Sequence, residues 1–323
     1  MIHYHSQSND PYFNLATEEY FLKNFDENIF MLYINEPSVI VGKHQNALAE
    51  INYKFVKENN IKVVRRLSGG GTVFHDYGNL NFCFIQKGEK DKLVDFRKYT
   101  KPILEVLNQL NVPARFSGKS DLVIGNKKFS GNAEHVYRNK VMHHGTILYN
   151  SAISNLSQAI KIDPFKYHDK AVKSNRSMVT NVIEYLDKKY STMEFIMLIF
   201  KHIQSDSNDF TNYELTGNDT NKIQELAENK YAQWEWNFGY SPKYQFVKKF
   251  NDGNDDLKIQ FNVEKGIIQA VHLDTNVLNL KEVLGKIEKE PHNEAALMQK
   301  IASVIKETKI LGMSIEEFVE QLF

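Results

Sequence analysis

Three consecutive glycines between two arginines and an apolar strand constrain this chain more than any other feature. The stretch runs from Arg65 to Asp76 and reads RRLSGGGTVFHD. Glycine has no Cβ, so its backbone can approach a ligand closely and can adopt positive φ. Backbone N–H groups in such a turn form a concave anion site, and a neighbouring guanidinium matches phosphate or carboxylate oxygens. The stretch predicts an anion cradle beside an apolar slot, although a hairpin turn with exposed arginines would use the same residues.

Composition narrows the class of protein. The 323 residues contain 40 Lys and Arg against 40 Asp and Glu, so no basic field attracts nucleic acid. The single cysteine, Cys83, rules out an internal disulfide framework and is typical of a reducing compartment. We see no secretory signal at the start, and the longest apolar runs, such as residues 195–200, are too short to cross a bilayer. We therefore expect a cytoplasmic protein without a membrane partner.

Periodicity predicts a mixture of helices and strands. Asn14 is the expected N-cap of a helix over residues 15–22. A two-residue Gly-Asn connection predicts a hairpin over residues 122–130. Runs of strands with interspersed helices favour an α+β fold over a doubly wound sheet. The other strands are expected at residues 30–34, 38–42, 61–66, 72–74, 81–85 and 144–149, and further helices at residues 53–60 and 99–110.

A change in composition near residues 234–242 predicts a second domain. The residues after it carry three strand patterns and several helical ones, and Ser314 and Glu317 form a capping box for the last helix. We therefore expect a large domain over residues 1–242 and a small α+β domain over residues 243–323.

Lys128 is the strongest candidate for chemistry because the hairpin fixes it, with Ser130 behind it. A lysine directed into a cleft can neutralise both an attacking carboxylate and the phosphate that it attacks. The alternative is a solvated hairpin tip, because Lys127 is its neighbour. Asp121 is a possible metal or hydroxyl ligand, or simply a turn residue.

Two further segments have both a functional and an ordinary interpretation. His143 and His144 are adjacent on an expected strand, so their rings point to opposite faces and cannot easily share a zinc ion. His144 either lines the cleft or is a satisfied core histidine. Residues 173–177 are polar and form either a loop that closes over a charged ligand or a plain surface loop.

Six segments, in this order and spacing, resemble the lipoate–protein ligase family. They are residues 14–19, 65–76, 118–122, 128–133, 143–146 and 174–181. The similarity extends over nearly the whole chain, including the small C-terminal domain. It implies a large catalytic domain built on a mixed sheet of the biotin and lipoate ligase type.

The resemblance also implies a reaction and its participants. ATP would activate lipoate to lipoyl-AMP with release of pyrophosphate, and a protein lysine would then take the lipoyl group and release AMP. The implied acceptors are the lipoyl domains of 2-oxo-acid dehydrogenase acyltransferase subunits, the glycine cleavage H protein, or both. Mg²⁺ is the implied metal.

The same resemblance implies which residues bind the substrates. Lys128 would touch both lipoate and the α-phosphate. The implied contacts of ATP and the adenylate are Arg66, Gly71, Thr72, Val73, Phe74 and Asp121, with Asp121 also the implied magnesium ligand. The implied contacts of lipoate are Ser68, Gly69, Gly70, Ser130 and His144. The loop implied to fold over the adenylate contributes Ser174, Arg176 and Asn181.

Rival functions exist on the same fold. Octanoyl and lipoyl transferases pass the acyl group through a cysteine thioester. Cys83 precedes the Lys128 hairpin, whereas those relatives place their nucleophile later, so we expect Cys83 to be a small buried hydrophobe. Biotin ligases carry a different Arg/Gly loop. An inactive relative that only binds a lipoyl domain or free lipoate is the other alternative, and the presence of Lys128 and Arg66 counts against it.

Overall fold

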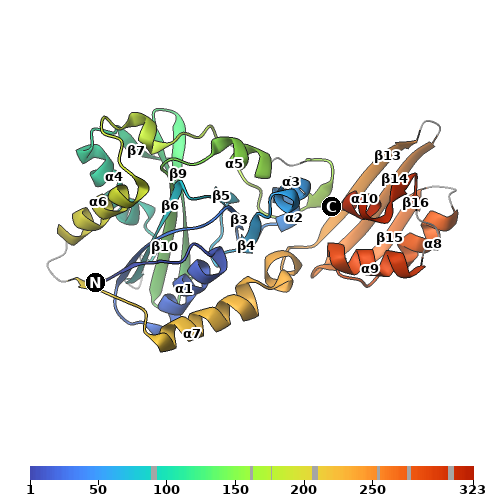
Figure 1. Ribbon diagram of the computed structural model, residues 1–323, viewed down its shortest axis with the longest axis horizontal. Helices are drawn as coiled ribbons and strands as arrows, with labels where there is room; N and C mark the ends of the chain where they lie inside the picture. Colours follow the sequence, from blue (N-terminus) through green and yellow to red (C-terminus); the bar gives the residue numbers. More distant parts are fainter. Residues whose placement is uncertain are drawn as a thin grey trace. The chain divides into compact units, whose positions relative to one another are not determined.

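The chain forms two compact units in the computed structural model (Figure 1). The structure describes residues 1–88, 93–160, 163–175, 177–205, 210–252, 255–274, 278–304 and 309–323. Unit 1 comprises Met1–Lys43, Ile61–Gln158 and Ser174–Gln233, and unit 2 comprises His44–Asn60, Ala159–Lys173 and Trp234–Phe323. The functional division into domains 1–242 and 243–323 stays a prediction.

An eight-stranded mixed sheet is the centre of unit 1. Its spatial order is β12-β1-β2-β6-β10-β9-β8-β7. β1 runs parallel to β2 and β12, whereas all other neighbours are antiparallel. The strands are β1 (Ile2–His5), β2 (Ile29–Ile34), β6 (Asn79–Lys87), β7 (Ala114–Ser117), β8 (Asp121–Ile124), β9 (Lys127–Tyr137), β10 (Lys140–Leu148) and β12 (Thr211–Asn212). The predicted α+β class and the predicted hairpin of β8 and β9 are confirmed.

A second, three-stranded sheet of unit 1 carries the glycine stretch. Its order is β4-β3-β5, with β4 at Lys62–Arg65, β3 at Ser38–Val41 and β5 at Val73–His75. β4 is parallel to β3 and β5 is antiparallel to it. Residues 66–72 therefore connect the two outer strands across the end of β3.

Helices α4 and α6 cover one face of the large sheet (Figure 1). Phe82, Phe84 and Phe129 of the sheet pack with Ile103 of α4 and Phe195 of α6 in one buried cluster. This burial of apolar surface is the main source of stability for the unit. The helices of unit 1 are α1 (Pro11–Asn24), α4 (Phe96–Gln109), α6 (Thr192–Ser205), α7 (Gly217–Leu226), η1 (Val182–Tyr185) and η2 (Ala227–Tyr231), and α5 (Ile153–Ala159) lies at its edge.

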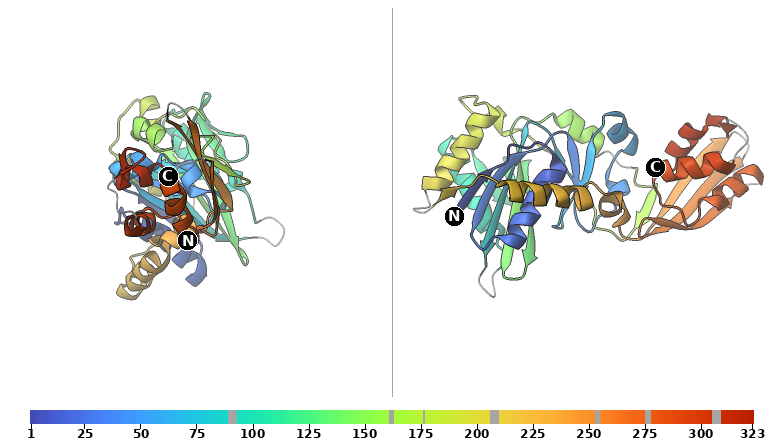
Figure 2. Two further views of the ribbon diagram at one scale, coloured as in Figure 1. Left: turned by 90° about the vertical axis from the view of Figure 1, so that its right-hand side faces the viewer. Right: turned by 60° about the horizontal axis from the view of Figure 1, so that its bottom comes forward.

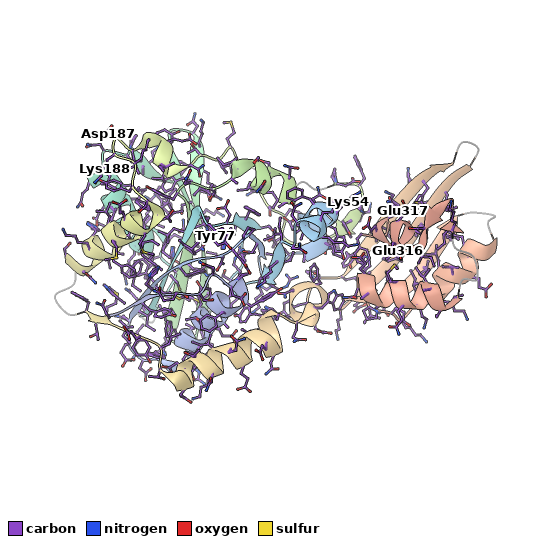
Figure 3. The ribbon with its side chains drawn as sticks, viewed as in Figure 1. Lys54, Tyr77, Asp187, Lys188, Glu316 and Glu317 are labelled. Carbon is purple, nitrogen blue, oxygen red and sulfur yellow. The ribbon has the colours of Figure 1, made fainter. Side chains whose placement is uncertain are left out.

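Unit 2 is an antiparallel sheet of order β11-β13-β14-β15 with helices α8, α9 and α10 on one face (Figures 1 and 2). The predicted capping box of Ser314 and Glu317 is confirmed at the start of α10, where Figure 3 labels Glu317. The remaining elements are β11 (Tyr167–Asp169), β13 (Tyr244–Asp252), β14 (Asp255–Glu264), β15 (Ile267–Asp274), β16 (Lys309–Ile310), β17 (Met313–Ser314), α2 (Ala47–Glu50), α3 (Tyr53–Glu58), η3 (Glu235–Gly239), α8 (Leu278–Lys286), α9 (Glu294–Val304) and α10 (Ile315–Glu320). Across the described parts of both units, every helix is too short or too polar to span a membrane.

The predicted N-cap at Asn14 is wrong. Helix α1 begins at Pro11, and the carboxylate of Asp10 accepts a hydrogen bond of 3.0 Å from the N–H of Tyr12. Proline at the first helical positions already has the φ that a helix needs and lacks an N–H that would go unpaired there. Asn14 is instead buried inside the helix, where its Nδ2 donates to Asn35 Oδ1 at 2.8 Å.

Two buried histidines should make the stability of unit 1 sensitive to acid. Burial lowers the pKa of His3 to about 4, and burial together with the charge of Arg66 lowers the pKa of His75 to about 3. Unfolded histidine takes up a proton near pH 6.5, whereas the folded forms do so only below about pH 4. The free energy of unfolding should therefore fall as the pH drops from 6.5 towards 4, by up to about 3 kcal/mol for each ring.

Urea unfolding at about pH 7.0 and pH 4.5 measures this change in the free energy of unfolding, because the two pH values bracket the titration of unfolded histidine. His3→Phe should lose about 2 kcal/mol less between the two pH values than the wild type. Exchange of the exposed His168 for glutamine is the control and should leave the loss unchanged. Equal losses in the wild type and His3→Phe would contradict the prediction.

Candidate active site

Arg66 organises the glycine turn from inside. Its Nε donates to Ser68 Oγ at 3.0 Å, and its Nη2 donates to the carbonyls of Gly69 and Gly71 at 2.6 and 2.8 Å. Its Nη1 donates to the carbonyl of Ile40 at 3.1 Å. Burial lowers the pKa of Arg66 to about 10, so the guanidinium stays charged at neutral pH. One planar fork thus fixes the turn and places a positive charge beneath it.

The arginines are not exposed, so the alternative of a plain hairpin turn with solvated arginines is wrong. Arg65 is fully buried and Arg66 is 6% exposed. Gly70 has a φ of +88°, and a Cβ there would lie 3.0 Å from Arg66 Nη2, so the turn needs glycine at this position. A Cβ on Gly69 would meet no heavy atom within 4 Å, so open space lies beside that residue.

The strand after the turn is held in register. Thr72 is buried, Val73 is half-buried and Phe74 is 2% exposed. In the small sheet, Val73 is the partner of Ile40 and Phe74 is the partner of Val39. The predicted nucleotide contacts from Gly71 to Phe74 therefore lie on the turn and the start of β5, next to the Arg66 charge.

Ser68, His144 and Glu18 form a buried line of hydrogen bonds. Ser68 Oγ lies 2.6 Å from His144 Nε2, and His144 Nδ1 lies 2.8 Å from Glu18 Oε2. All three residues are less than 10% exposed. The line joins the turn, strand β10 and helix α1. Both ring nitrogens of His144 therefore have partners, and the ring lies directly behind the glycine turn.

Lys128 is the second positive group of the site. Its Nζ lies 2.8 Å from Asp121 Oδ1, and its side chain is 26% exposed. A Cβ on Gly131 would lie 3.1 Å from that Nζ, so the lysine folds back over this glycine. Its neighbour Lys127 is exposed. Lys128 is thus an ion-paired and partly sheltered ammonium group rather than a solvated hairpin tip.

One segment connects the lysine with the glycine turn. The N–H of Lys128 donates to the carbonyl of Met178 at 2.8 Å, and the N–H of Thr180 donates to the carbonyl of Lys128 at 3.0 Å. At its other end, Ser174 Oγ accepts from the N–H of Thr72 at 2.8 Å. A Cβ on Gly71 would lie only 3.1 Å from Ser174 Oγ. Ser174 therefore contacts the glycine turn, and Met178 and Thr180 contact the backbone of the strand that carries Lys128.

The other residues predicted for this loop have different positions. The amide of Asn181 is bound to the backbone of Ser151 in both directions, at 2.9 and 3.0 Å, so it anchors the end of the segment. Arg176 lies outside the described residues. Their predicted contact with an adenylate stays a prediction.

Ser130 and His143 lie on the neighbouring strands. Ser130 is 1% exposed, and its Oγ accepts from Asn132 Nδ2 at 3.2 Å. His143 Nδ1 lies 2.8 Å from Glu134 Oε1, and burial lowers the pKa of His143. The two neighbouring histidines thus have separate partners, His143 with Glu134 and His144 with Ser68 on the opposite face of the strand.

A metal ion would find few protein ligands. Within the described residues, no group of three His, Cys, Asp or Glu side chains could hold one. Asp121 supplies one carboxylate, and that carboxylate is already paired with Lys128. Mg²⁺ is commonly held by one or two carboxylates together with substrate phosphates, so a magnesium ion here would depend on the phosphates. The predicted role of Asp121 as a magnesium ligand stays a prediction.

Sequence reasoning missed Glu18 as a member of the site. In the sequence it is one of two adjacent acids near the start of a helix, which is a common pattern with an electrostatic explanation. The sequence feature that could have revealed Glu18 is the apolar character of its neighbours, Leu15, Ala16, Tyr20 and Phe21. An acid on a helix that is apolar nearly all round must be buried, and a buried acid needs a partner.

Comparison with known proteins places the chain in a family. Residues 10–204 match the family described as the lipoyl protein ligase A/B catalytic domain. The chain is 43% identical over 267 residues to the lipoate–protein ligase LplJ of Bacillus subtilis, covering 81% of this chain and 80% of that protein.

Solved structures agree with this match. A lipoate–protein ligase A bound with ATP has a TM-score of 0.63 and 26% identity, covering 74% of this chain and 97% of that one. A bipartite lipoate protein ligase from Thermoplasma acidophilum, described with its E2 lipoyl domain, has a TM-score of 0.64 and 26% identity, covering 74% of this chain and 96% of that one. The chain therefore belongs to the lipoyl protein ligase A/B catalytic domain family, as the resemblance in its sequence predicted.

Proposed function

We infer that this chain is a lipoate–protein ligase, which activates lipoate with ATP and transfers the lipoyl group to a lysine of an acceptor protein. The observation that carries the inference is the segment from Ser174 to Thr180, which joins the Lys128 strand to the glycine turn. It connects the strand that carries an ion-paired ammonium group with an anion cradle. The names of the relatives and the ATP-bound neighbour support the same activity.

Adenylation would come first. A carboxylate oxygen of lipoate attacks the α-phosphorus of ATP, the bond to the bridging oxygen breaks, and pyrophosphate leaves with that electron pair. Negative charge gathers between two anions during this step. The ammonium of Lys128 would stabilise that charge, since preorganised cations at the reacting atoms are the largest single source of rate enhancement in many enzymes. The turn from Gly69 to Thr72, above the Arg66 charge, would hold the phosphate.

Transfer would follow at the same place. The amine of the acceptor lysine attacks the carbonyl carbon of lipoyl-AMP, the C–O bond to AMP breaks, and the amine loses a proton. AMP leaves readily, whereas hydroxide from a free carboxylate would not. Lys128 would again balance the charge on the departing phosphate. Exclusion of water from the site would protect the mixed anhydride from hydrolysis.

The finer participants belong to the same proposal. The Thermoplasma neighbour is described with an E2 lipoyl domain, which supports lipoyl domains of 2-oxo-acid dehydrogenase complexes, or the glycine cleavage H protein, as acceptors. Mg²⁺ would accompany ATP, with Asp121 able to offer one carboxylate. The lone cysteine is not in a disulfide, which fits a cytoplasmic enzyme.

Pyrophosphate release tests the function without an acceptor. The protein is incubated with ATP, magnesium and lipoate, and pyrophosphate is measured by a coupled assay. A ligase releases pyrophosphate only when lipoate is present, up to an amount that matches the enzyme, and retains lipoyl-AMP. A protein that only binds lipoate or a lipoyl domain, or one that uses an acyl thioester, releases none.

Cys83 should be dispensable for transfer. Cys83 is fully buried in β6, and burial followed by the charge of Glu18 raises the pKa of its thiol, so the reactive thiolate is suppressed. Cys83→Ser keeps a small hydrogen-bonding side chain and should retain more than about half of the lipoyl transfer rate, because no step of the ligase reaction needs the sulfur. A loss of nearly all transfer to a lipoyl domain would instead support a thioester mechanism.

A further inference from the structure

The carboxylate of Glu18, on helix α1, contacts His144 on the side of the ring that faces away from the glycine turn. Glu18 is 2% exposed, and its Oε2 lies 2.8 Å from Nδ1 of His144. On the other side of the ring, Nε2 lies 2.6 Å from Ser68 Oγ. The ring thus lies between an acceptor and a hydroxyl group, so its tautomer decides which way every hydrogen bond in the line points.

The chemistry of the partners settles that direction. An ionised carboxylate only accepts hydrogen bonds, so Nδ1 of a neutral His144 must carry the proton and donate to Glu18. Nε2 is then an acceptor, and the hydroxyl of Ser68 must donate to it. The same Ser68 oxygen accepts from Nε of Arg66 at 3.0 Å. The Ser68 proton is therefore committed to His144, and the hydroxyl has no proton left for a ligand beside the glycine turn.

The surroundings keep Glu18 in this role. The hydroxyl of Tyr33 donates to Glu18 Oε1 at 3.0 Å, and the thiol of Cys83 also hydrogen-bonds to the carboxylate. The charge of Glu18 opposes the effect of burial on the pKa of Arg66. A buried carboxylate with this many partners has one orientation and one set of contacts.

We propose that Glu18 is a positioning residue, which holds His144 as the Nδ1–H tautomer and thereby fixes the Ser68 hydroxyl as a donor to His144. The catalytic consequence rests on the proposed ligase function, whereas the hydrogen-bond geometry does not. Glu18 acts through His144 and Ser68, because both lie between it and the turn. Ser68 then presents only its one remaining oxygen lone pair to the ligand side.

Glu18→Gln should reverse the direction of the hydrogen bonds that run from Ser68 through His144 to residue 18. The amide oxygen takes the place of Oε1 because Tyr33 needs an acceptor, so the amide NH₂ faces Nδ1 of His144. Nδ1 then has to accept, Nε2 carries the proton, and Ser68 receives donors from both His144 and Arg66. The Ser68 hydroxyl then no longer donates its hydrogen to His144 and must point it in another direction. The shape of the site is preserved while the polarity of one group in it changes.

Nitrogen NMR of histidine-labelled protein reads the tautomer directly. The chain has 11 histidines, and the signals of His144 are identified by their loss in His144→Gln. We expect a protonated Nδ1 in the wild type and a protonated Nε2 in Glu18→Gln. Tyr33→Phe is the matched control, because it removes a donor to the same carboxylate without touching the histidine, and it should keep the wild-type tautomer.

Activity then tests the role. In Glu18→Gln, kcat/KM for lipoate, measured as pyrophosphate release with a lipoyl domain in excess, should fall by about 10- to 100-fold, the loss that follows removal of the partner that orients a metal-binding histidine. In Tyr33→Phe, kcat/KM should fall less than about threefold, since the hydrogen bond that is lost involves neither His144 nor Ser68. Thermal unfolding of each variant confirms that the comparison is between folded proteins.

Three results would overturn the proposal. They are a wild-type ring protonated at Nε2 or at both nitrogens, an unchanged tautomer in Glu18→Gln, and a reversed tautomer with unchanged kcat/KM for lipoate. Absence of pyrophosphate release by the wild type would instead overturn the ligase function and leave the histidine geometry to be decided by the spectra.

Discussion

Lys128→Met should lower the rate of lipoate-dependent pyrophosphate release by about 10²- to 10⁴-fold, the range seen when one preorganised charge-stabilising group is removed from an active site. Methionine has a similar length and flexibility but carries no charge. Asp121 would lose its partner at 2.8 Å. Because the charge is needed at the phosphate rather than for folding, the loss should appear mainly in kcat.

Lys127→Met is the matched control for this experiment. Lys127 lies in the same hairpin but is exposed, whereas Lys128 is partly sheltered and ion-paired. We expect Lys127→Met to stay within about twofold of the wild-type rate, as is usual for a surface substitution. If both variants lose activity equally, the effect comes from the hairpin as a whole and Lys128 has no special role.

Arg66→Lys should destabilise unit 1 by about 2–4 kcal/mol and abolish most adenylation, although the charge is conserved. Lysine cannot donate to Ser68, Gly69, Gly71 and Ile40 at once, because its ammonium is a point donor rather than a planar fork. Each buried partner left without a donor costs about 1–3 kcal/mol. The turn would lose its shape although a positive charge is retained. Urea unfolding and pyrophosphate release measure the two losses.

Arg115→Lys provides the comparison for this substitution. Arg115 is exposed and donates one hydrogen bond, of 2.9 Å, to the carbonyl of Gly125. A change at such a position should alter stability by less than about 0.5 kcal/mol. Equal stability of Arg66→Lys and the wild type would show that the fork of hydrogen bonds does not maintain the turn.

The sequence predicted the local elements because their signals are local. The Gly-Asn connection between β8 and β9 and the capping box at Ser314 each depend on a few adjacent residues. The start of α1 was missed because two local signals competed there. Asp10-Pro11 begins the helix, and Asn14, which also suits an N-cap, is used in tertiary hydrogen bonds instead. Competition of this kind is decided by the packing of the whole unit.

The site was predictable where it lies on one stretch of chain. The glycine turn and Lys128 each stood out from their own neighbours. The line from Glu18 through His144 to Ser68 joins residues 76 and 126 positions apart, so no pattern within a window of sequence reveals it. Likewise, polar residues at 173–177 suggested a loop, but its attachment to Thr72 and Lys128 depends on tertiary contacts.

The attachment of Ser174 at the turn and of Thr180 at the lysine strand limits how this region can diverge among relatives. The contact of Met178 with Lys128 comes from its backbone, and its side chain is 70% exposed, so that side chain is open to replacement. Insertions and deletions between the two anchors should not be tolerated, since each would pull one anchor from its partner. Homologous chains should therefore keep the number of residues between the two anchors constant, while the side chain at the position of Met178 varies.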